Sequence, residues 1–149
     1  MEKSQAIDPL LELLKETCKA KDINFAALKK RLQYLVGSDT VTGYYISEGP
    51  FPTREDVILD VFILSPLSLY NIDVRTTRKA EVIILCHRLF LDQISLIEEK
   101  PEYSEDGQLF IACVIFTAMH DLVLRVPESK HDDAEKFFTK ITDAVVTIK

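Results

Sequence analysis

The chain has 149 residues, of which 47% are hydrophobic and 28% are charged, and its formal net charge is −6. This composition is ordinary for a globular protein and excludes a chain that is disordered throughout. The longest apolar-rich run, residues 109–119, is much shorter than the roughly 20 residues that a membrane-spanning helix needs. The first residues lack the pattern of a secretory signal, so we expect a cytoplasmic protein with one main domain.

The charge is unevenly distributed along the chain. Residues 1–37 carry seven Lys or Arg and five Asp or Glu, whereas residues 38–149 carry eleven and nineteen. An acidic main body is repelled by phosphate backbones and by anionic lipid headgroups. We therefore expect neither nucleic acid nor an anionic membrane as a partner.

Two short helices are predicted before any strand. Asp8 and Pro9 are typical of a helix start, and the leucines that follow them give this helix an apolar face. A second helix is predicted from about Asn24, with Gly37 placed to end it. Residues 1–37 are therefore assigned to an N-terminal helical appendage.

Seven strands are predicted from residue 40 onward, because the apolar period changes there to two. None of the connections between them is long enough for a crossover helix, so the strands should pair antiparallel, as hairpins or a meander. The predicted strands cover residues 40–47, 56–64, 67–75, 79–88, 92–98, 108–118 and 121–126.

The chain is predicted to finish on an amphipathic helix that follows the last strand directly. Ser129 and Asp132 have the spacing of a capping box at its start. At about 100° per residue, its apolar residues share one face, and that face must cover part of the sheet. These residues are Ala134, Phe137, Phe138, Ile141, Ala144, Val145 and Ile148.

This element order resembles the pleckstrin-homology-like superfold, in which two nearly orthogonal sheets form a bent barrel closed by the last helix. The segment FLDQISLIEE, residues 90–99, is similar to the fifth strand of lipid-regulated and bacterial members. Phe137 and Phe138 stand in the final helix, where many classical members carry a tryptophan. The implied fold class is α+β: a seven-stranded antiparallel bent barrel or sandwich over residues 38–149, closed by a C-terminal helix and preceded by two short helices.

The resemblance does not extend to the loop with which some members of the superfold bind inositol lipids. Those members carry clustered Lys and Arg between the first two strands, whereas Arg54 is the only cation of residues 42–62 here. Members without this loop mostly bind proteins or peptides or act as assembly modules. The resemblance therefore implies a binding or scaffolding role.

Four residues are candidates for contact with a partner. Phe51 lies between two prolines, which suits either an anchor in an interface or a ring that folds back on the protein. Arg54 is the cation of the same loop. Leu10 and Leu14 belong to an apolar helix face that must be buried, either on the chain's own sheet or in a homodimer.

Patterns for catalysis and metal binding are weak. Cys86 and His87 are adjacent on a strand, so their side chains point to opposite faces and cannot act as nucleophile and base together. His87 and His120 lack a recognised ligand spacing, and the acidic residues between 98 and 106 lack that of a calcium loop. The basic residues 29–31 are interpreted as a solvent face or as a contact for an acidic partner. We expect no enzyme, no cofactor and no metal.

The leading hypothesis is a non-enzymatic module that recognises a protein or peptide. The peptide would add an edge strand in the groove between the fifth strand and the closing helix. One alternative is a carrier for lipid or a small apolar ligand, indicated by the aliphatic strand VILDVFIL. Another is an acidic secretion-chaperone-like dimer, although that class usually has a helix between its third and fourth strands, for which the sequence has no room.

Overall fold

The computed structural model describes residues 2–49, 51, 54–77, 81–119 and 121–148, with side chains described from residue 7. Two α-helices come first, seven strands follow, and a third α-helix ends the described chain. The α+β prediction is therefore confirmed. The elements are α1 (Glu2–Lys21), α2 (Phe25–Val36), β1 (Gly43–Glu48), β2 (Val57–Leu64), β3 (Ser68–Thr76), β4 (Val82–Phe90), β5 (Ile94–Tyr103), β6 (Leu109–Thr117), β7 (Asp121–Pro127) and α3 (His131–Ile148).

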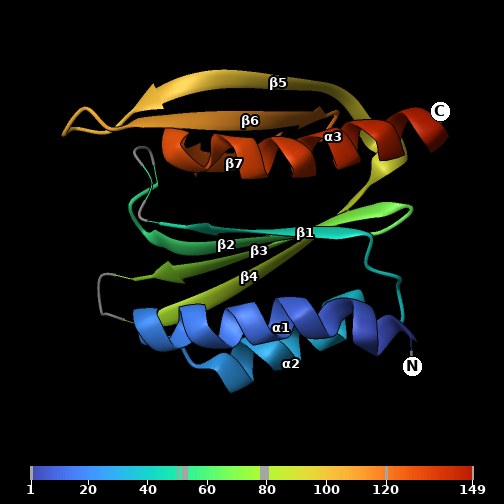
Figure 1. Ribbon diagram of the computed structural model, residues 1–149, viewed down its shortest axis with the longest axis horizontal. Helices are drawn as coiled ribbons and strands as arrows, with labels where there is room; N and C mark the ends of the chain where they lie inside the picture. Colours follow the sequence, from blue (N-terminus) through green and yellow to red (C-terminus); the bar gives the residue numbers. More distant parts are fainter. Residues whose placement is uncertain (1, 50, 52–53, 78–80, 120, 149) are drawn as a thin grey trace.

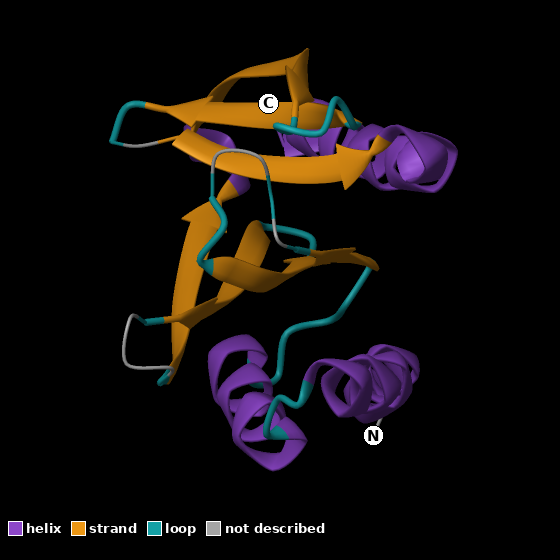
Figure 2. Cartoon of the chain, turned by 90° about the vertical axis from the view of Figure 1, so that its left-hand side faces the viewer, coloured by secondary structure: helices purple, strands orange, loops and turns teal. Residues whose placement is uncertain are grey.

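The strands form two antiparallel meanders. One sheet has the order β1-β2-β3-β4 and the other has the order β5-β6-β7. A short 3-10 turn, Leu91–Gln93, carries the chain from β4 into β5. The four-stranded sheet lies in the middle of the molecule, with α1 and α2 on one side and the second sheet with α3 on the other (Figure 1). Figure 2 shows the same layers from the side.

Strand β2 is buried on both faces because both faces of the middle sheet are covered. Leu59, Val61 and Ile63 pack with the N-terminal helices, whereas Phe62 and Leu64 pack in the second core with α3 and the three-stranded sheet. A strand covered on both faces requires a nearly continuous apolar sequence. The aliphatic character of VILDVFIL is thus explained by packing within the chain, and it does not require an apolar ligand.

Helix α2 has the boundaries that its sequence predicts. The side chain of Asn24 accepts a hydrogen bond from the backbone N–H of Ala27 at 3.1 Å, and Gly37, at φ 58°, donates its N–H to the carbonyl of Gln33 at 3.0 Å. Helix α1 differs from the prediction, because it begins at Glu2 and holds Pro9 inside. The turn before the proline places Ile7 in the core, and this burial compensates for the missing backbone donor.

As predicted, the apolar face of helix α3 covers sheet surface, and it does so in a core that contains residues of both sheets. Phe137, Phe138 and Ile141 are buried there, and the Phe137 ring stacks on Tyr45 of β1 with centroids 6.2 Å apart. The predicted capping box is wrong. A 3-10 turn, Glu128–Lys130, precedes α3, so Ser129 lies inside this turn and cannot cap the helix.

Candidate functional site

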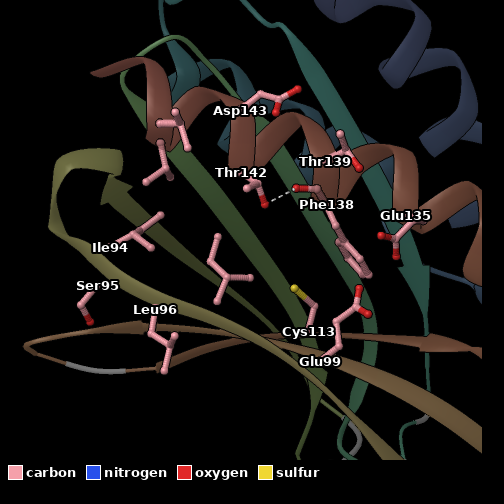
Figure 3. Close-up of a pocket in the computed structure, with 13 residues that line it drawn as sticks. Ile94, Ser95, Leu96, Glu99, Cys113, Glu135, Phe138, Thr139, Thr142 and Asp143 are labelled. Atoms are coloured by element: carbon pink, nitrogen blue, oxygen red, sulfur yellow. Dashed lines mark hydrogen bonds between the residues drawn. The ribbon is translucent and has the colours of Figure 1, made fainter. Parts of the chain in front are cut away.

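A groove runs between β5 and α3, and we refer to it as the β5–α3 groove (Figure 3). Its volume is about 500 Å³, and its lining comes from these two elements with Cys113 of β6. Ile94 lies close to the C-terminal half of α3, and Glu99 lies close to the first turn of α3. Strand and helix are therefore antiparallel along the groove.

The β5 side of the groove is the edge of a sheet. Among the described strands, β6 is the only one that pairs with β5. At the start of β5, where the register with β6 shifts between Ile94 and Leu96, residues 94–97 line the groove consecutively, and farther along Glu99 and its β6 partner Cys113 line it from one face of the sheet. Pro101 lies within β5, and proline, which has no N–H to donate, is confined to edge strands or bulges. The groove therefore borders an edge to which another strand can be added.

The α3 side of the groove presents apolar and hydroxyl side chains. Phe138 and Val145 line it, and Val146 at its rim is 69% exposed. On the facing strand, Leu96 is 49% exposed. The hydroxyl of Thr142 donates a hydrogen bond to the carbonyl of Phe138 at 3.1 Å, within the helix itself (Figure 3). The groove thus leaves apolar surface in contact with water.

The charged groups along the groove are all acidic among its described lining residues. They are Glu99 of β5 with Glu135 and Asp143 of α3, and no Lys or Arg is among them. Burial raises the pKa of Glu99, the neighbouring Glu135 carboxylate raises it further, and His131 lowers it. A ligand with a positive charge is favoured here over an anionic one.

Cys113 forms part of the groove floor and is not an activated nucleophile. Its side chain is almost fully buried, and burial together with the charges of Glu99 and Glu135 raises its pKa to about 12. A reactive cysteine needs a lowered pKa, because the thiolate and not the thiol is the nucleophile. The chemistry of the groove therefore favours binding over nucleophilic catalysis.

None of the four predicted contact residues lines this groove. Leu10 and Leu14 are fully buried between α1, α2 and the middle sheet. Of the two alternatives for this helix face, the structure therefore shows burial on the chain's own sheet. Phe51 is 1% exposed, and its ring meets Phe110 edge-on at 6.4 Å between centroids, so it folds back on the protein. The prolines on either side of Phe51 lie outside the described residues.

Arg54 belongs to a polar cluster between the two sheets. Its guanidinium lies 3.9 Å from Asp73 and 4.0 Å from Asp56. Arg75 approaches the same Asp73 carboxylate at 2.8 Å. The cluster, with Asp60, borders a small cavity of about 200 Å³. The guanidinium of Arg54 is therefore engaged in ion pairs with acidic residues of its own chain.

Sequence reasoning missed the centre of this polar cluster, which is a pair of buried aspartates. Asp60 and Asp73 face each other across β2 and β3, and both are more than nine-tenths buried. Burial and the neighbouring Asp73 raise the pKa of Asp60 to about 9. Burial acts in the same direction on Asp73, but hydrogen bonds from Asp60 and Arg75 outweigh it and lower the pKa of Asp73. The available signal was an aspartate in the middle of the apolar run VILDVFIL.

The other weak candidates lie apart from one another. Cys86 packs against the core formed with the N-terminal helices, whereas the adjacent His87 is exposed, so the two point to opposite faces as predicted. His120 lies outside the described residues. The basic residues 29–31 are exposed on α2. Glu102, from the acidic segment, accepts a hydrogen bond from Arg125 at 2.9 Å.

The comparisons with known proteins give no family. No protein-family model, no curated protein and no solved structure matches this chain. None of the described helices combines the length and the hydropathy needed to cross a membrane.

Proposed function

We propose that this chain is a non-enzymatic binding module that takes an extended peptide of its protein partner into the β5–α3 groove. The peptide adds a strand to the edge of β5 and packs its side chains against α3. Its sequence carries apolar residues and at least one Lys or Arg. The edge position of β5 beside an apolar helix face is the observation that carries this proposal.

Main-chain pairing supplies the affinity in such a complex. An edge strand offers backbone donors and acceptors to a second extended chain, and this mode of recognition needs no change of fold. The second sheet has three strands, and β5 is long enough, at 10 residues, to pair with a peptide over several positions. A peptide there would continue the order β5-β6-β7 by one strand.

Side-chain contacts supply the specificity. Alternate residues of an added strand point to one side, toward Phe138, Val145 and the exposed Val146. The acidic groups at the two ends of the groove, Glu99 and Asp143, favour a basic residue in the peptide. This charge pattern argues against an acidic peptide and against a fatty acid as the occupant.

We also infer that the two sheets and α3 form an arrangement of the pleckstrin-homology-like type. The support is the order of seven antiparallel strands before a helix whose apolar face lies between the sheets. Dimerisation in the manner of secretion chaperones stays an alternative, which sedimentation analysis of the full chain tests. A stable dimer that binds no peptide would favour that alternative.

The proposal is tested by selecting binders from a random peptide library displayed on phage, with the full chain as bait. We expect selected peptides with alternating apolar residues and a Lys or Arg. The variants Leu96→Asp and Val146→Asp should bind these peptides at least about tenfold more weakly, because a charge replaces the apolar rim. Both positions are exposed, so the fold should be retained.

The matched control is Val82→Asp, which places the same charge at a 48% exposed position on β4, the edge strand of the other sheet. This variant should bind the selected peptides as the native chain does. The proposal would be wrong if the library yields no binder, or if all three variants bind equally well.

A further inference from the structure

We propose that Glu99, His131 and Glu135 form a binding site for a divalent transition-metal ion, of which Zn²⁺ is the best fit. The three residues offer one ligand atom each, and these atoms all lie within 4.8 Å of one another. The Nε2 atom of His131 lies 3.3 Å from Glu135 Oε2 and 3.9 Å from Glu99 Oε2. The site closes one end of the β5–α3 groove.

The fold brings these ligands together from two elements. His131 and Glu135 are four residues apart on α3, so they lie on the same face of the helix. Glu99 reaches them from β5, and its carboxylate and that of Glu135 come from opposite sides of the groove (Figure 3). A metal ion bound here would connect the edge strand to the helix.

The separations suit zinc coordination. With zinc–ligand bonds of about 2.0–2.1 Å in a tetrahedron, ligand atoms lie about 3.3 Å apart. The His131–Glu135 distance has this value, and the His131–Glu99 distance exceeds it by an amount that a rotation of the exposed Glu99 side chain can close. Three protein ligands leave a fourth position for water or for a group of a partner.

The side chains of His131, Glu99 and Glu135 leave part of their hydrogen-bonding and ion-pairing capacity unused within the chain. The Nε2 atom of His131 is fully covered and has no hydrogen bond, although its ring is about one-third exposed. Glu99 and Glu135 interact side chain to side chain, and their only ion pairs within the described part of the chain are those with His131. A simple ion pair would have the imidazolium donate Nε2–H to a carboxylate. A metal ion would engage all three groups.

The donor set selects the class of ion. An imidazole with two carboxylates suits Zn²⁺ and neighbouring transition metals, whereas Ca²⁺ and Mg²⁺ prefer oxygen ligands alone. Cys113 lies in the lining of the same groove and is not one of the three clustered ligands. A bound ion would compete with a basic peptide side chain for Glu99 and Glu135. Metal binding is therefore measured in the absence of peptide.

The test is calorimetric titration of the full chain, after treatment with a chelator, with Zn²⁺ and separately with Mg²⁺. We expect one zinc ion per chain and a higher melting temperature with zinc, with no such effect of magnesium. His131→Gln and Glu99→Gln should each weaken zinc binding by more than about tenfold. Loss of a residue that only supports a metal ligand already costs about that much, so loss of a ligand itself should cost more. The Co²⁺ complex should show visible absorption bands that both variants lose.

The matched controls are Glu98→Gln on the same strand and Asp132→Asn on the same helix, both exposed. They remove a charge without removing a proposed ligand, so they should bind zinc as the native chain does. Zinc binding that survives His131→Gln, or no zinc binding by the native chain, would overturn the proposal. Neither outcome decides the peptide proposal, because the peptide selection is carried out without metal and its test variants change Leu96 and Val146.

Discussion

The substitution Asp60→Asn tests the buried pair of aspartates between the sheets. Asp60 is 5% exposed and its pKa is raised to about 9, first by burial and then by Asp73. At neutral pH this group therefore holds its proton in the folded protein. In the unfolded chain an aspartate has a pKa of about 3.9 and is ionised at neutral pH.

This difference makes the free energy of unfolding depend on pH. Between about pH 4 and pH 9 the folded state binds a proton that the unfolded state releases, so stability falls as pH rises, by up to about 1.4 kcal/mol per pH unit. From pH 5 to pH 8 the fall amounts to roughly 4 kcal/mol. Asp73 acts in the opposite direction, because its pKa is lowered, but its effect lies below about pH 4.

Asparagine at position 60 has nearly the same shape and stays neutral at every pH. Asp60→Asn should therefore be more stable than the native chain at pH 8, and the free energy of unfolding of the variant should be flatter from pH 5 to pH 8. Urea unfolding followed by circular dichroism at several pH values measures both. Asp92→Asn, at an exposed position in the turn before β5, should keep the native pH profile. Parallel pH profiles for Asp60→Asn and the native chain would mean that Asp60 does not hold a proton in the folded protein at neutral pH.

Two further substitutions test the packing of α3 and of the loop that carries Phe51. Phe137→Ala should lower the free energy of unfolding by about 3–5 kcal/mol, because it removes a ring that is 3% exposed. The control Val146→Ala, at an exposed position of the same helix, should change it by about 0.5 kcal/mol or less. Urea unfolding measures both variants. Gly49→Ala should cost about 1–3 kcal/mol, because the added methyl group would clash with the carbonyl of Val57, and an unchanged melting temperature would contradict this contact.

Local sequence patterns were sufficient to predict most of the elements. The period of two gave the seven strands, and the apolar stripe of α3, with Phe137 and Phe138 at its centre, predicted a helix that covers sheet surface. The position of the groove could be predicted from the order of the elements, because an edge strand next to a closing helix has an unpaired edge on that side. Pro101 was an additional signal for an edge strand, but the fifth strand was predicted to end at residue 98, whereas β5 continues to Tyr103.

The remaining features depend on register and on contacts between distant residues. Asp60 and Asp73 meet only because β2 and β3 pair in one register, and Glu99 meets His131 only because α3 returns along β5. No periodicity in a single segment contains this information. The start of α1 was missed for a related reason, because burial of Ile7 in a core formed with the middle sheet outweighs the local signal of Pro9.

We place the binding surface of the protein at the border between β5 and α3. Nuclear magnetic resonance of the ¹⁵N-labelled full chain, titrated with a peptide selected from the library, tests this placement residue by residue. We expect the largest amide shifts on residues 95–99 of β5 and 138–146 of α3. Shifts that cluster on α1, α2 or β4 instead, with β5 unchanged, would contradict it.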